Sequence, residues 1–81
     1  MDQHEILAQV QSLVDEEHAL RARTQQGELA PEEEQAQLRR VEEALDQCWD
    51  LLRQRRARQD AGQDPDQAVV RPVSEVEGYQ Q

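Results

Sequence analysis

Apolar residues recur at helical spacing over the first 25 positions. One line of positions, separated by three or four residues, consists of Ile6, Val10, Leu13, Glu17, Leu20 and Thr24, with Glu17 its charged member. Steps of three and four mark one face of an α-helix, whereas a strand would alternate. Leu7 and Val14 lie beside this line and widen it. The pattern predicts a helix over about residues 3–25, and Gly27 suits the cap that follows it.

A second helical pattern begins after a short polar segment. Pro31 is suited to a first helical position, and three glutamates follow it, where the helix dipole favours negative charge. The apolar line then consists of Leu38, Val41, Leu45, Cys48, Leu52 and Arg55. Trp49 and Leu51 widen this line, and neither glycine nor proline interrupts the chain before Gly62. We therefore predict a second helix over about residues 31–61.

The short connection between these helices predicts an antiparallel helical hairpin, and hence an all-α fold. Both apolar stripes are wider than the strip that a single neighbouring helix covers. In an isolated hairpin, the exposed residues would be Leu7, Val14, Trp49 and Leu51. We therefore predict that two hairpins dimerise into a four-helix bundle. The alternative is that the C-terminal tail folds back over the exposed stripe.

The tail, residues 62–81, differs in composition from the helices. It opens with a turn-forming segment around Pro65, and Arg71 precedes a second proline, which favours extended backbone. Our main prediction is an extended or partly disordered tail. Two alternatives remain. In one, Val73, Val76 or Tyr79 docks in a groove of the bundle. In the other, the tail is a linear peptide that another protein binds.

Composition narrows the functional classes. The 81 residues carry a formal net charge of −9, and every basic residue is arginine. Such an acidic chain repels a phosphate backbone, and no apolar run is long enough to span a membrane. One cysteine excludes an intrachain disulfide framework, and the acidic opening predicts a cytoplasmic protein without a signal peptide. No nucleotide-binding, phosphate-binding or catalytic-triad motif occurs, so we predict no cofactor and no enzymatic activity.

Four ordered blocks of sequence carry a resemblance. They are residues 13–18 (LVDEEH), residues 45–57 (LDQCWDLLRQRRA), residues 62–66 (GQDPD) and residues 76–79 (VEGY). With these blocks the chain resembles a family of small actinobacterial proteins that is catalogued as a domain of unknown function. The resemblance implies a stand-alone bacterial cytosolic protein of about this length. It implies no activity, substrate or catalytic residue.

One constellation suggests a metal site. Asp15 and His18 are three residues apart on the first helix, and the second helix offers Glu42 or Glu43 near the same level. Helical bundles that bind two metal ions use related spacings of carboxylate and histidine. However, the wheel places His18 outside the apolar stripe and Asp15 farther away. A solvated acidic helix face explains the same residues without a metal ion.

The remaining candidates are contact residues. Glu17, inside the apolar stripe, either pairs with a charged group and fixes register or bends to the surface. Cys48 is interpreted as core packing. The second helix ends in a basic cluster of Arg53, Arg55, Arg56 and Arg58, from which a nucleic-acid contact is an alternative function.

The function that the sequence favours is a non-enzymatic protein–protein interaction or adaptor module, with a metal-binding bundle and a nucleic-acid-associated protein as alternatives. The candidate contact residues are Leu7, Val14, Glu17, Trp49, Leu51, Arg53, Arg55, Arg56, Arg58, Val73, Val76 and Tyr79. The partners expected are a second copy of the chain and an unidentified protein.

Overall fold

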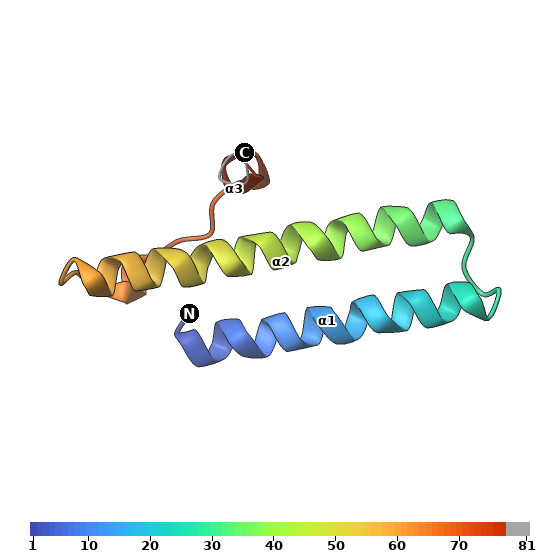
Figure 1. Ribbon diagram of the computed structural model, residues 1–81, viewed down its shortest axis with the longest axis horizontal. Coiled ribbons are helices and arrows are strands. Elements are labelled where there is room, and N and C mark those ends of the chain that lie inside the picture. Colours follow the sequence, from blue (N-terminus) through green and yellow to red (C-terminus); the bar gives the residue numbers. More distant parts are fainter. Residues whose placement is uncertain (78–81) are drawn as a thin grey trace.

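The computed structural model describes residues 1–77 and consists of two long antiparallel helices followed by a short tail (Figure 1). Helix α1 spans Gln3–Gln25 and helix α2 spans Pro31–Asp60. The tail contains a 3-10 turn, η1, at Pro65–Gln67 and a short helix, α3, at Val73–Glu77. No strand occurs within residues 1–77, so the predicted all-α class is confirmed.

Local capping sets both ends of α1. The Asp2 carboxylate accepts a hydrogen bond from the Glu5 backbone N–H at 2.8 Å, which satisfies one of the free donors of the first turn. At the other end, Gly27 has φ of +77°, a left-handed conformation in which a glycine avoids the steric cost of a side chain. The Glu28 N–H then reaches back to the Arg23 carbonyl at 2.9 Å, which completes a Schellman cap.

Helix α2 ends in the same motif. Gly62 has φ of +73°, and the Gln63 N–H donates to the Arg58 carbonyl at 2.7 Å. At its start, Ala30 supplies no side-chain cap, and Pro31 occupies the first turn, where a missing N–H costs nothing. The left-handed residue at Gly62 redirects the chain, and the tail then returns along α2 (Figure 1).

The hairpin core consists of two apolar clusters. The first contains Ile6, Val10, Cys48 and Leu51, and the second contains Leu20, Leu29, Leu38 and Val41. Leu13 and Leu45 pack against both clusters and join them. Leu29 was not among the residues predicted to face the core, because it lies in the connection between the helices. It is only 6% exposed and closes the core at the turn.

The described part of the tail, residues 62–77, is folded against α2. Both η1 and α3 contact α2, and α3 lies beside α2 on the side away from α1 (Figure 1). The turn at η1 is fixed by Asp64, whose carboxylate accepts the Asp66 N–H at 2.9 Å. Val76 in α3 has no exposed surface. The segment between η1 and α3 lacks helical structure.

Candidate functional site

Two sides of helix α2 carry two different sets of candidate contact residues. Gln47, Asp50 and Gln54 follow one another at steps of three and four, and so share one side. Trp49, Leu52 and Arg56 share another side by the same rule. At about 100° per residue the two stripes lie about 160° apart around the helix.

The first side, named the tail-docking face, consists of Gln47, Asp50 and Gln54. Asp50 has no exposed surface, although it is an acidic residue in an acidic chain. Its carboxylate accepts two hydrogen bonds from the Arg71 guanidinium, of which the Nε–Oδ2 bond measures 2.9 Å. The Gln54 amide donates a further bond to Oδ2 at 2.8 Å. The bonds from Arg71 above all hold the pKa of Asp50 below its ordinary value, against the opposing effect of burial.

The same face binds the main chain of the tail. The Gln54 amide nitrogen donates to the Val69 carbonyl at 2.7 Å, and its amide oxygen accepts the Val69 N–H at 3.3 Å. The Gln47 amide donates to the Arg71 carbonyl at 3.2 Å. Two side-chain amides therefore hold the backbone of an extended segment, and Asp50 holds its arginine. Sequence reasoning missed all three residues of this face, because polar residues on a long acidic helix resemble a solvated surface.

Arg55 connects the N-terminal residue to the turn that follows α2. Its guanidinium nitrogen Nη1 donates to the Met1 carbonyl at 2.8 Å and to the Pro65 carbonyl at 3.2 Å. The same nitrogen lies 2.9 Å from the Asp66 carboxylate. Arg55 is only 8% exposed. It therefore joins the start of α1, the end of α2 and η1, and it is not a surface cation.

The four arginines at the end of α2 do not form a single basic patch. Arg53 and Arg56 are exposed, whereas Arg55 is buried in the contacts just described. Arg58 is half-buried and donates to the Gln63 side chain at 3.4 Å. A nucleic-acid surface needs several cations directed outward together, so this arrangement gives that alternative no support.

The second side of α2, with the neighbouring side of α1, is named the Trp49 face and consists of Leu7, Val14, Trp49 and Leu52. Leu7 and Trp49 are each 44% exposed. A surface hollow near the start of α1 is lined by Gln3, Leu7, Leu52, Arg55, Arg56, Gln59 and Asp60. Leu52 and Arg56 belong to the Trp49 stripe, so this hollow places Leu7 on the same side of the hairpin. Val14 is half-buried and packs against the first core cluster.

Other predicted contact residues have different positions. Leu51, which an isolated hairpin would leave exposed, is 5% exposed in the first core cluster, against which Ala68 of the tail also packs. Val76 is buried and Val73 half-buried, while Tyr79 lies outside the described residues. Glu17 is half-buried, with its carboxylate 3.8 Å from Nε of Arg21 on the next turn.

The residues proposed for a metal site are not brought together. Within residues 1–77, no three His, Cys, Asp or Glu side chains are close enough to hold a metal ion. Asp15 and His18 are both exposed, and Asp15 accepts a bond from the Gln11 amide at 3.0 Å. This geometry supports the interpretation of these residues as a solvated helix face.

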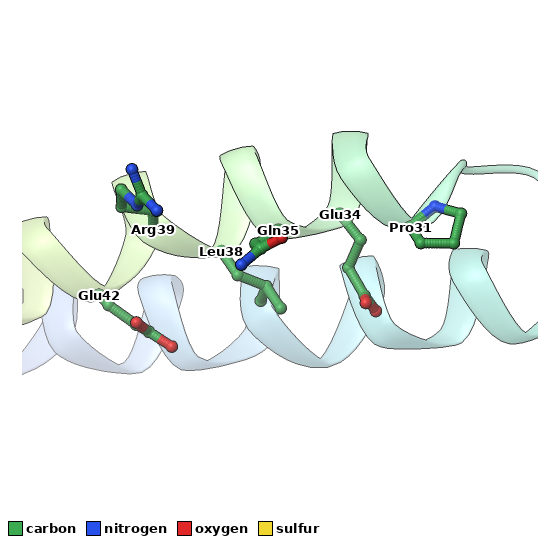
Figure 2. A pocket seen from close by; sticks show the side chains of 6 residues that line it. All are labelled: Pro31, Glu34, Gln35, Leu38, Arg39 and Glu42. Atoms are coloured by element: carbon green, nitrogen blue, oxygen red, sulfur yellow. The ribbon is translucent and has the colours of Figure 1, made fainter.

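A further hollow lies near the connection between the helices, and α2 alone supplies its lining (Figure 2). The lining residues are Pro31, Glu34, Gln35, Leu38, Arg39 and Glu42. It holds two carboxylates and one cation, and both Glu42 and Arg39 are exposed.

Cys48 faces the core. The thiol is buried beside Ile6 and Val10, and burial raises its pKa. A thiol with a raised pKa is a poor nucleophile, so Cys48 contributes to packing.

Comparison with known proteins identifies the family. A family model described as "Protein of unknown function (DUF2630)" matches residues 2–81. The chain belongs to this family. Its relatives include uncharacterized proteins of Mycobacterium bovis and of two strains of Mycobacterium tuberculosis, each 60% identical over 75 residues. The alignments cover 93% of this chain and 86% of each relative. The resemblance to a small actinobacterial family of unknown function is thus confirmed.

No solved structure matches the chain. Among the described helices, none combines the length and the apolar character that crossing a membrane requires.

Proposed function

We propose that this chain is a cytoplasmic, non-enzymatic protein–protein interaction module that self-associates through the Trp49 face. The observation that carries the proposal is the exposure of Trp49 and Leu7, each 44%, on the side of the hairpin that the tail leaves open. Tryptophan is among the residues that most often dominate the energy of protein interfaces. A large aromatic side chain that shares one side of the hairpin with a second exposed apolar residue is typical of such a surface.

The charge of this face suits a second copy of the chain. The positions on α1 at helical spacing from Leu7 are Gln11, Val14, His18, Arg21 and Gln25, none of which is a carboxylate. The corresponding line on α2 consists of Glu42, Leu45, Trp49, Leu52 and Arg56. One acid and one base on α2 leave this strip near neutrality within a chain of net charge −9. Two copies meeting here avoid much of the repulsion that other faces would produce.

A two-fold symmetric dimer would pair this face with itself. Each hairpin would then cover the exposed apolar residues of the other, and the four long helices would form a bundle. The tail would remain on the outer side of each α2, about 160° from the Trp49 stripe by helical geometry. Self-association and tail docking therefore use separate surfaces.

The test is the solution mass by light scattering over a dilution series. We expect the mass of a dimer for the natural chain and a dissociation constant raised at least about tenfold by Trp49→Ala, because the variant removes this anchor from both copies. Val70→Ala is the matched control, because Val70 is 59% exposed but lies in the tail. A monomer mass for the natural chain at millimolar concentration would contradict the proposal, as would equal dissociation constants for the natural chain and Trp49→Ala.

A further inference from the structure

The tail-docking face has the properties of a peptide-binding site. It takes an extended segment, holds its backbone at Val69 and Arg71 through two side-chain amides, and offers one carboxylate for a guanidinium. Val76 then docks without exposed surface. Main-chain bonds of this kind are independent of sequence. The face therefore demands only an arginine and, on its C-terminal side, an apolar residue.

The segment that occupies this face is electrostatically a poor ligand. Residues 62–76 contain three carboxylates (Asp64, Asp66 and Glu75), and their one basic residue is Arg71. They dock on residues 1–61, which carry 14 carboxylates and eight arginines, and α2 places Glu43, Asp46 and one cation, Arg53, beside the face. Apart from the Arg71–Asp50 and Asp66–Arg55 pairs, much of the long-range interaction between tail and body is therefore repulsive. A segment that keeps this arginine and this apolar residue but carries additional cations would be attracted to the acidic chain, whereas the acidic tail is repelled by it.

We propose that the tail-docking face of α2 is a binding site for an extended, arginine-centred segment of a basic partner protein, and that the chain's own tail is its built-in competitor. The inference goes beyond the proposed self-association and uses a different side of α2. Covalent attachment explains how an acidic segment holds the site. Because the tail is tethered, its effective concentration at the site is in the millimolar range. A segment of another protein must therefore bind the site more tightly than the tail does in order to displace it. The basic partner supplies that affinity through charge.

The test uses the full chain and a synthetic peptide of residues 67–77 in which Glu75→Arg and Glu77→Arg make the segment basic. Binding is measured by titration calorimetry to the natural chain and to Val76→Ala. That substitution weakens the competitor without leaving a buried charge unpaired. We expect Val76→Ala to bind the peptide about tenfold more tightly than the natural chain, since a weaker tail is easier to displace. The side-chain amide resonances of Gln54 should shift on binding, because the Gln54 amide would release the Val69 backbone of the tail and bind the Val69 backbone of the peptide.

Three controls make the outcome specific. The same peptide with Arg71→Ala should lose at least tenfold in affinity, and a scrambled peptide of identical charge should not move the Gln54 resonances. A chain carrying Gln54→Ala with Val76→Ala should bind the basic peptide more weakly than Val76→Ala alone. Equal binding of the scrambled peptide would overturn the proposal, since it would show general charge attraction. Absence of binding to Val76→Ala at millimolar peptide would overturn it as well.

Self-association and peptide binding can be tested independently of each other. Trp49→Ala should weaken self-association while leaving the affinity for the basic peptide unchanged. Loss of peptide binding in Trp49→Ala would contradict the assignment of the ligand to the tail-docking face. A natural chain that is monomeric but binds the peptide would refute only the self-association.

Discussion

The guanidinium of Arg71 forms a two-point ion pair with the carboxylate of Asp50, 21 residues away in the chain. The Asp50 side chain is fully shielded from solvent, whereas that of Arg71 keeps 27% of its surface exposed. A buried carboxylate without water depends on its partner for stabilisation of its charge. The helical hairpin and the tail are therefore energetically coupled through this pair, in addition to the contacts of Gln47, Gln54 and Arg55 with the tail.

Arg71→Ala should lower the free energy of unfolding by about 3 kcal/mol, because it leaves the Asp50 carboxylate buried without its cation. Urea unfolding followed by circular dichroism measures the loss. Arg21→Ala is the control, since the side chain of Arg21 is 55% exposed and its distance to Glu17 is 3.8 Å. Such an exposed pair contributes at most about 0.5 kcal/mol. Equal losses in the two variants would contradict the special role of the buried pair.

The stability of the fold should depend on pH through Asp50. Its pKa is lower in the folded chain than the ordinary 3.8, chiefly because Arg71 donates to its carboxylate. The stabilisation is therefore complete above that ordinary value and is lost as the pH falls below it, through the lower pKa of the folded state. Asp50→Asn and Arg71→Ala should each reduce the loss of stability at acidic pH. The double variant should reduce this loss by no more than the single variants do. An unchanged acid profile in Asp50→Asn would exclude Asp50 as its source.

Arg55→Ala should destabilise the chain by about 2–3 kcal/mol, because two carbonyls and the Asp66 carboxylate lose their shared donor. Arg56→Ala, one position farther along and exposed, should change the free energy of unfolding by no more than about 0.5 kcal/mol. Arg55→Lys keeps the charge but not the planar guanidinium that holds Nη1 near all three acceptors, so it should fall between these values. Comparable losses for positions 55 and 56 would show that the contacts of Arg55 add nothing.

Gly62→Ala should lower the free energy of unfolding by about 1 kcal/mol through its left-handed backbone alone. No atom lies within 4 Å of where the new Cβ would stand, so a steric clash is not the cause. Gly27→Ala should cost a similar amount, because its environment is equally open and its φ is +77°. Thermal unfolding checks both variants, and Ala61→Gly serves as a control with φ of −90°. A stabilising effect of Gly62→Ala would contradict the capping argument.

The two long helices could be predicted from sequence because each is encoded by local spacing. The apolar lines containing Ile6 and Val41 and the glycine after α1 are features of neighbouring residues. The tail-docking face could not be found this way. Its contacts join Asp50 to Arg71 and Gln54 to Val69, and no local pattern shows that a helix glutamine will bind a distant backbone. A single arginine within an acidic, valine-containing tail was the available signal. Leu29 was missed for the same reason, since burial of a connection residue depends on the packing around it.

Trp49 is positioned to report, through its fluorescence, when a partner covers the Trp49 face. It is the only tryptophan, it is 44% exposed, and it lies on the side of α2 away from the residues that hold the tail. Indole emission and its quenching by iodide should therefore respond when a partner covers this side, and should be insensitive to release of the tail. Dilution that separates two copies would shift the emission to longer wavelengths, whereas Arg71→Ala would leave the spectrum of the monomer unaltered.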